Sequence, residues 1–218
     1  FQNSVINAFV KMYEMGYIYK GERLVNWDPH FKTAISDLEV ENIEVDGYFW
    51  HIKYPLKNKE NYDYEELDEN GKLSFKDNRN YISIATTRPE TMLGDGAIAV
   101  HPDDDRYKNI VGKEVIIPIA NRAIPIIADQ YPDPNFGSGA VKITGAHDFN
   151  DYMVAKKHNL DFFKLMDESA CMCHEDFIPE KYRGLERYKA REILLKELEQ
   201  KGFLLKTEEK KIIQPFGD

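Results

Sequence analysis

Residues 81–102 read YISIATTRPETMLGDGAIAVHP, in which two short apolar segments flank a polar turn. The first segment, 81–87, is rich in β-branched residues and predicts a strand, and 97–101 predicts a second one. Gly94 and Gly96 mark the loop that joins them. Strands and helices do not alternate strictly here or elsewhere in the chain, which argues against a doubly wound parallel sheet.

The remaining chain predicts further short strands and three clear helices. Helical spacing of apolar residues predicts helices over 3–15, 148–158 and 185–201. Strands are predicted over 21–28, 114–119, 124–129, 140–144 and 162–166. Hairpins are predicted over 40–54, with an Asp46-Gly47 turn, and over 58–80, with an Asn70-Gly71 turn. A helical turn is predicted over 103–109 and a loop over 131–139. We therefore expect an α+β fold, in which helices surround a mixed or antiparallel, barrel-like β-sheet.

Length and charge limit the possible functions. The chain has 218 residues, of which 42% are hydrophobic, and its 38 acidic residues outnumber 29 basic ones to leave a net charge of −9. Such a chain holds one domain, or one domain with an appendage. The acidic balance argues against a free-standing protein that binds nucleic acid by bulk charge, because phosphate groups attract basic surfaces. No apolar run reaches the ~20 residues that a membrane helix needs, so we expect no membrane partner.

The start of the chain and its cysteines indicate where the protein works. The sequence begins at Phe1 within a helical pattern and carries no leader, so we expect a fragment of a longer, cytoplasmic protein. Cys171 and Cys173 are one residue apart, too close for an unstrained disulfide, which agrees with a reducing compartment. Together with His174 they could bind a metal, but without a second ligand pair a plain loop is favoured.

Polar residues beside glycines gather in two stretches, 86–91 and 136–151. The sequence contains neither a Walker loop nor a Gly-x-Gly-x-x-Gly nucleotide cradle. It also contains neither a Gly-x-Ser-x-Gly elbow nor a His-Glu-x-x-His zinc helix. The two polar stretches are therefore the candidates for chemistry.

Spacing brings polar residues of the second stretch together. Lys142 and Thr144 lie on the same face of a strand, because side chains alternate with a period of two. Asp148 and Asp151 share a face of the following helix. A turn between strand and helix would bring both pairs to one cleft. That cleft offers carboxylates for an ammonium or hydroxyl group, and a hydroxyl and an ammonium for a carbonyl or phosphate.

Ordinary structural roles explain several of the same residues. Asp148 occupies the position of a helix N-cap. Thr86 and Thr87 are common strand residues, and Arg88 could pair with Glu90 at the surface. Spacing alone leaves these roles and a functional site equally open.

Two peptides resemble the signature peptides of a known family, the editing domain of class I aminoacyl-tRNA synthetases. They are TTRPET at 86–91 and GAVKITGAHD at 139–148. The valyl, isoleucyl and leucyl enzymes carry this domain as an insertion. Four further stretches are similar to the valyl enzymes: NWDP at 26–29, TAISDLEVE at 33–41, GDGAIAVHP at 94–102 and YRGLER at 182–187. Together the matches cover most of the chain.

The resemblance implies that the chain hydrolyses threonine wrongly esterified to tRNA(Val). It implies a stem from the synthetase body at 1–42, an editing domain at 43–210 and a return linker at 211–218. It also implies a monomer that acts on the tRNA 3′ end together with the remainder of the synthetase, without cofactor or metal. ATP would bind only to the parent enzyme, because the ATP signature peptides are absent here.

Two alternatives stay open beside this function. One is a non-catalytic, tRNA-binding or structural module of a synthetase. The other is a metal hydrolase that uses His101, His147 and Asp148.

The resemblance also carries roles onto single residues. Asp148, Lys142 and Thr144 match catalytic positions, and Asp148 would hold the α-ammonium group of the substrate. Asp151, with Lys142 and Thr144, matches the positions that recognise the threonine hydroxyl. The other substrate-binding positions are matched by Thr86, Thr87, Arg88, Thr91, Phe136 and His147, of which Phe136 would lie near the terminal adenosine.

The sequence departs from the family pattern in two places. The usual Thr-Pro-Ala-His-Asp reads TGAHD at 144–148, and a glycine at 145 would loosen the turn before Asp148. The segment 166–181 departs from the usual acidic-glycine turn, and we predict that it is a variable loop.

Overall fold

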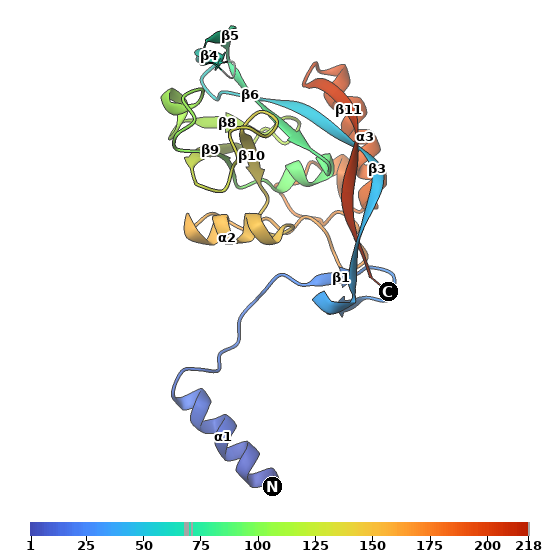
Figure 1. The fold of residues 1–218 in the computed structure, drawn as a ribbon. Helices are drawn as coiled ribbons and strands as arrows, with labels where there is room; N and C mark the ends of the chain where they lie inside the picture. The colour runs from blue at the N-terminus through green and yellow to red at the C-terminus, as the bar shows by residue number, and fades with distance from the viewer. Residues whose placement is uncertain (68–69, 71, 218) are drawn as a thin grey trace.

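The computed structural model describes residues 1–67, 70 and 72–217 of the chain (Figure 1). Its α-helices are α1 (Gln2–Glu14), α2 (Phe149–Lys157) and α3 (Arg187–Gln200), and its short 3-10 helices are η1 (Asp37–Glu39), η2 (Pro89–Gly94), η3 (Lys108–Ile110) and η4 (Glu180–Tyr182). Its strands are β1 (Asn26–Asp28), β2 (Thr33–Ile35), β3 (Val40–Pro55), β4 (Tyr62–Leu67), β5 (Leu73–Arg79), β6 (Tyr81–Thr86), β7 (Ala97–Val100), β8 (Glu114–Ile116), β9 (Ala123–Ala128), β10 (Ala140–Ile143) and β11 (Leu204–Gly217).

Two sheets form the body of the molecule. One has the strand order β10-β7-β9-β8, in which β7 and β9 run parallel and the other neighbours run antiparallel. The other is antiparallel, with the order β11-β3-β6. The pairs β1-β2 and β4-β5 are separate antiparallel ribbons. This mixture of sheets and helices confirms the predicted α+β class.

The core joins both sheets to α3. One cluster of buried side chains contains residues from both sheets and from this helix, among them Ile52, Ile84, Ile98, Ile126 and Leu194. A second cluster joins α2 to β7 and β10. Strand β7 is therefore buried on both of its faces, which explains why all of its residues are apolar.

The barrel-like part of the fold prediction is not confirmed. Within the described residues, each sheet has two free edges and none closes on itself. A barrel requires every strand to pair on both sides. Instead, the lower parts of β3 and β11 leave the body as a long two-stranded ribbon (Figure 1).

The predicted hairpin over 40–54 is wrong, because these residues form the single strand β3. Asp46 and Gly47 lie in its middle, opposite Lys211 and Lys210 of β11. Gly47 leaves room for the side chain of Ile212, since a Cβ at this position would lie 2.5 Å from it. The partner strand comes from the other end of the chain, so local alternation of residues could not reveal it.

Most other local predictions are confirmed, with shorter or shifted boundaries. The three helices form, and 58–80 forms the hairpin β4-β5, although Gly71 of its predicted turn lies outside the described residues. The strand predicted over 21–28 is reduced to β1, and the turn over 103–109 keeps only η3 as helix. Residues 162–166 do not form a strand, because only Met166 makes a bridge, to Met172. The expected return linker overlaps β11, and the domain boundaries stay predictions.

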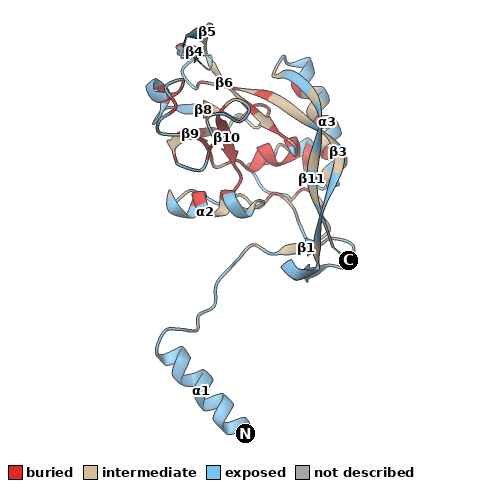
Figure 2. Cartoon of the chain, viewed as in Figure 1, coloured by how far each residue is buried: buried red, intermediate tan, exposed pale blue. Residues whose placement is uncertain are grey.

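Helix α1 extends away from the body and is exposed along its whole length (Figure 2). Its apolar side chains, such as Phe9 and Tyr13, have no core to pack against within the described residues. In the part of the chain that the structure describes, we find no helix with the length and apolar character needed to cross a membrane.

Candidate active site

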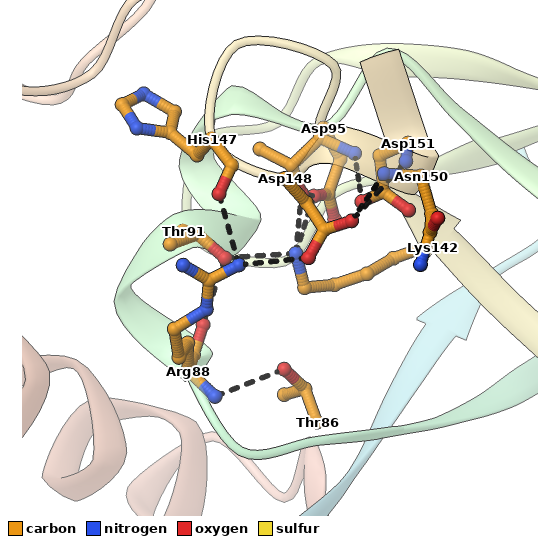
Figure 3. A network of polar contacts seen from close by, with 10 residues as sticks. Thr86, Arg88, Thr91, Asp95, Lys142, His147, Asp148, Asn150 and Asp151 are labelled. Atoms are coloured by element: carbon orange, nitrogen blue, oxygen red, sulfur yellow. Dashed lines mark hydrogen bonds and ion pairs between the residues drawn. The ribbon is translucent and has the colours of Figure 1, made fainter. Parts of the chain in front are cut away.

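A buried polar network surrounds the ammonium group of Lys142 (Figure 3). Its Nζ donates to Thr91 Oγ1 at 2.8 Å and to Asp95 Oδ1 at 3.1 Å, and also donates to Thr144 Oγ1. Thr144 Oγ1 in turn donates to Asp95 Oδ1 at 2.6 Å. The hydroxyl of Tyr54 donates to the other oxygen of Asp95 at 2.8 Å. All three protons of the ammonium group therefore have acceptors.

The local structure explains how these residues meet. Lys142 lies in β10 and Thr144 directly after it, on the same face, as the period of two predicts. The buried 3-10 helix η2 carries Thr91 and ends at Gly94, directly before Asp95. Backbone pairing of β10 with β7 brings the end of β10 beside the loop that follows η2, and Gly96 N donates to Ile143 O at 2.8 Å.

Asp151 lies next to this network in the first turn of α2. Its Oδ2 accepts a hydrogen bond from the backbone nitrogen of Thr144 at 2.8 Å, and the residue is 6% exposed. Burial raises the pKa of Asp151 to about 6, although the nearby charge of Lys142 opposes the shift. Burial also raises the pKa of Asp95, against the opposing effects of Lys142, Thr144 and Tyr54.

Asp148 connects the two predicted polar stretches. Its Oδ1 caps α2 by accepting from the backbone nitrogens of Asn150 at 2.9 Å and Asp151 at 3.2 Å. Its Oδ2 accepts from Arg88 Nη2 at 3.3 Å, and the same nitrogen donates to the carbonyl oxygen of His147 at 3.0 Å. The capping role and the contact with the first stretch are therefore both present, on different oxygens of one carboxylate.

Arg88 does not pair with Glu90, which corrects one of the structural alternatives. Glu90 is buried and forms two hydrogen bonds with Arg191 of α3, at 2.7 and 2.8 Å. The backbone turns sharply after β6, where Thr86 Oγ1 accepts from Arg88 N at 3.1 Å. That turn directs the Arg88 side chain to Asp148 instead.

The imidazole of His147 points away from the network (Figure 3). Its Nε2 accepts a hydrogen bond from the backbone nitrogen of Leu165 at 2.8 Å. Burial, together with the positive charges of Arg88 and Lys142, lowers the pKa of His147 to about 4. The residue thus contributes its backbone carbonyl to the site, and its ring fixes the neighbouring segment.

The remaining predicted residues lie at the margin of the network. Thr87 is half-buried and follows the end of β6. Phe136 is 56% exposed and lies outside the polar network, with its ring centroid 6.3 Å from that of Phe49. Lys210 Nζ lies 5.0 Å from the Phe136 ring and 5.1 Å from the Phe49 ring. The structure therefore brings Thr86, Arg88, Thr91, Lys142, Thr144, Asp148 and Asp151 together, and places Phe136 apart.

Gly145 is closely packed rather than loose. A Cβ at this position would lie 2.7 Å from the Cβ of Ala155 and 3.0 Å from the ring of Phe162. The turn between β10 and α2 therefore lies directly against α2, and a side chain at Gly145 would require the turn, Ala155 or the ring of Phe162 to shift.

Sequence reasoning missed two members of the network, Asp95 and Tyr54. Asp95 had a detectable signal, since it lies between two glycines immediately before an apolar strand. Tyr54 had none, because it lies in β3, outside both polar stretches. Both residues are 0% exposed.

The metal alternatives receive no support from the geometry. Over residues 1–67, 70 and 72–217, we find no group of three or more His, Cys, Asp or Glu side chains that could hold a metal ion. His101 and His147 bond to Gln130 and to the Leu165 backbone, respectively. Neither the Cys171, Cys173 and His174 group nor the His101, His147 and Asp148 group forms a metal cluster in the described part of the chain.

The arrangement suits a small ligand that carries both an ammonium and a hydroxyl group. Asp148 is partly exposed and its partner Arg88 is exposed, so a competing cation can reach the carboxylate. Asp151 and Thr144 place polar atoms directly behind it. The buried charges of Lys142 and Asp95 close the site on the core side.

Comparison with known proteins defines the class. A family model described as tRNA synthetases class I (I, L, M and V) matches residues 1–214. The chain therefore belongs to the class I tRNA synthetases of this group.

Individual relatives are valine–tRNA ligases. The chain is 47% identical to the enzyme of Ruegeria pomeroyi over 276 residues, covering 100% of this chain and 27% of that protein. It is 50% identical to the enzymes of Xanthomonas campestris pv. campestris and Caulobacter vibrioides, covering 99% of this chain and 23% and 24% of those proteins. Among solved structures, the LeuRS–tRNA–LeuAMS ternary complex of Agrobacterium radiobacter K84 matches with a TM-score of 0.48 and 16% identity, covering 97% of this chain and 32% of that one.

The chain spans about a quarter of the length of the valine–tRNA ligases it matches. The similarity to these ligases extends over the whole chain, as the sequence resemblance predicts.

Proposed function

We propose that this chain is the editing domain of a valine–tRNA ligase and hydrolyses threonine wrongly esterified to tRNA(Val). One observation carries the proposal: the residues that match the editing peptides converge on one polar site, with Arg88 and Asp148 at its surface and Asp151, Thr144 and Lys142 behind them. The similarity to valine–tRNA ligases supports the choice of tRNA.

The chemistry of the amino acids explains why such a site is needed. Threonine and valine are isosteres, and an apolar synthetic pocket rejects the added hydroxyl by only about a hundredfold, a known figure for this pair. A polar pocket reverses the preference. If valine fails to supply the hydrogen bond that threonine would donate to a buried carboxylate such as that of Asp151, the cost is about 1–3 kcal/mol.

Each polar group then has a role toward the ester. The α-ammonium of the substrate would replace Arg88 at Oδ2 of Asp148, and the threonine hydroxyl would donate to Asp151. Lys142 supplies positive charge beside the site, where negative charge develops on the ester oxygen during attack by water. The aminoacyl ester is already labile, so orientation of a water molecule is the main task.

The same proposal is compatible with the net charge of −9. Carboxylates at 148 and 151 are needed for the ammonium and hydroxyl groups, and the rest of the synthetase would hold the tRNA and deliver its 3′ end. This segment alone should therefore bind tRNA weakly, because phosphate contacts require basic surfaces. We propose a cytoplasmic, monomeric synthetase, with no metal or cofactor at this site, and ATP bound elsewhere in the complete enzyme.

Deacylation by the complete protein that contains this segment tests the proposal. Thr-tRNA(Val) should be hydrolysed faster than Val-tRNA(Val). Asp148→Asn keeps a good helix cap but removes the charge, and should lower kcat/KM for the threonyl ester by about 10–100-fold, as expected for loss of a charged hydrogen bond. The exposed Asp103→Asn is the matched control and should change nothing.

Equal hydrolysis of both esters by the unaltered protein would overturn the proposal. Binding of threonyl and valyl analogues without discrimination or turnover would instead indicate the non-catalytic tRNA-binding module.

A further inference from the structure

The hydroxyl group of Tyr54 donates to a carboxylate that is itself completely buried. Two other buried tyrosines, Tyr64 and Tyr182, also donate to carboxylates, but those of Glu66 and Glu197 are only partly buried. Buried tyrosines need a partner for the hydroxyl, and a backbone carbonyl is sufficient. Tyr62 and Tyr107 use this solution, donating to the carbonyl oxygens of Tyr81 at 3.1 Å and Ser138 at 2.6 Å. Tyr54 is 0% exposed and donates instead to the carboxylate of Asp95, at 2.8 Å.

Proton accounting shows what this contact does. Asp95 accepts from Tyr54 on Oδ2 and from both Lys142 and Thr144 on Oδ1, so it acts as an ionised acceptor. The Thr144 proton is directed to Asp95, which leaves Thr144 Oγ1 to accept from Lys142. Each hydrogen bond that links Tyr54, Asp95, Thr144 and Lys142 thus has one defined donor and one defined acceptor.

We propose that Tyr54 is a positioning residue of the site: it holds one oxygen of Asp95 so that the other fixes Lys142 and Thr144. The catalytic consequence of this role rests on the proposed editing function. The hydrogen-bond geometry around Asp95 is independent of that function. Without the phenol hydroxyl, Oδ2 of Asp95 would lose its donor, and no water could replace it directly because the Asp95 side chain is 0% exposed. The carboxylate could then rotate or take up a proton, and Lys142 and Thr144 would lose their fixed acceptor.

Other charges around Asp95 set the direction of the effect. Lys142 faces it from β10, and Arg122, from the segment between β8 and β9, lies close enough to interact electrostatically with Asp95 and Tyr54. Asp151 of α2 contributes negative charge from the other side. The hydrogen bond from Tyr54 lowers the pKa of Asp95, so its removal should make Asp95 easier to protonate.

Tyr54→Phe tests the proposal, because it removes only the hydroxyl oxygen. In the complete protein, kcat for Thr-tRNA(Val) should fall by about tenfold with little change in KM, consistent with loss of one hydrogen bond in the site. The acidic limb of the kcat profile should move to higher pH. Tyr62→Phe is the matched control, a buried tyrosine whose hydroxyl donates to a backbone carbonyl, and it should leave both kcat and the pH profile unchanged.

A second measurement is independent of activity. Carbon NMR of the Asp95 carboxyl group in the 218-residue chain should show its titration moving to higher pH in Tyr54→Phe but not in Tyr62→Phe. An unchanged Asp95 titration in a folded Tyr54→Phe chain would overturn the positioning role. If the unaltered protein does not discriminate between the esters while the Asp95 titration moves, the proposed function fails and the positioning role stands.

Discussion

Two pairs of an aspartate and a cation lie at the same end of the molecule, and they differ in burial. In the Lys142–Asp95 pair the side chains are 10% and 0% exposed, and N and O are 3.1 Å apart. In the Arg88–Asp148 pair they are 47% and 38% exposed, at a similar distance of 3.3 Å. Distance alone would make the two pairs equivalent, and the surroundings make them different.

The difference separates a fixed part of the site from a replaceable one. Buried charges must be paired, because an isolated charge in the core is costly. Exposed pairs are worth about 0–1 kcal/mol, so a ligand can open them at little cost. The buried pair therefore suits a framework, and the exposed pair suits the exchange of Arg88 for a substrate ammonium.

The largest expected effect comes from breaking the buried pair. Lys142→Met leaves Asp95 as an unpaired charge in the core and should reduce the free energy of unfolding by about 3–5 kcal/mol. Arg88→Met, the same change at the exposed pair, should cost about 0–1 kcal/mol. Urea unfolding followed by circular dichroism measures both.

A second substitution keeps this test decisive if Lys142→Met fails to fold. Adding Asp95→Asn removes the unpaired charge and should recover part of the lost stability. Equal losses for Lys142→Met and Arg88→Met would show that burial does not distinguish the two pairs.

The next effect concerns pH and Asp151. Its pKa of about 6 in the folded chain lies above the ordinary value of 3.8. The protonated carboxyl group of Asp151 therefore contributes its full stabilisation of the fold below about pH 4. That contribution is lost as the pH rises to about 6 and beyond. Asp151→Asn cannot ionise. Between pH 4 and pH 7 the free energy of unfolding of the variant, relative to the unaltered chain, should therefore rise by about 2–3 kcal/mol.

The titration of His147 changes the free energy of unfolding in the opposite direction with pH, and this change should become visible in Asp151→Asn. The lowered pKa of His147, about 4, means that the unfolded chain binds a proton between pH 4 and 6.5 that the folded chain does not. Stability from this group rises with pH over that window. Parallel pH profiles for Asp151→Asn and the unaltered chain would contradict the assignment, and the exposed Asp103→Asn is the control.

The smallest effect separates the two roles of Asp148. Asp148→Ala removes the cap of α2 and should cost about 1 kcal/mol of stability. Asp148→Asn, which caps a helix equally well, should leave the free energy of unfolding almost unchanged. Thermal or urea unfolding of both variants checks this. A large loss of stability in Asp148→Asn would mean that the exposed pair with Arg88 stabilises the fold, which would contradict its description as a replaceable pair.

Local patterns predicted single helices and strands, whatever their distance in the chain from the elements they pack against. The β-branched composition of β6 and the helical spacing of α3 depend on neighbouring residues, and both elements form. The hairpin at Asp46 and Gly47 failed because β11 returns from the far end of the chain to pair with this stretch. A strand with a long-range partner shows the same alternation as a hairpin arm.

Some residues of the site could also be predicted from the sequence, and others could not. Spacing on a strand and on a helix placed Lys142 beside Thr144 and Asp148 beside Asp151, and the resemblance added Arg88. The contact of Tyr54 with Asp95 could not be predicted, because it depends on how β3 packs against the segment that follows η2.

The sequence by itself determines which side chains can carry charge, roughly where most helices and strands lie, and which family the chain belongs to. The tertiary structure alone decides that β3 is one strand, that His147 points away, and that one aspartate–cation pair is buried while the other is exposed. The physical reason is that burial depends on contacts between residues far apart in the chain. Burial in turn sets the strength of a charge pair and the pKa of an acid.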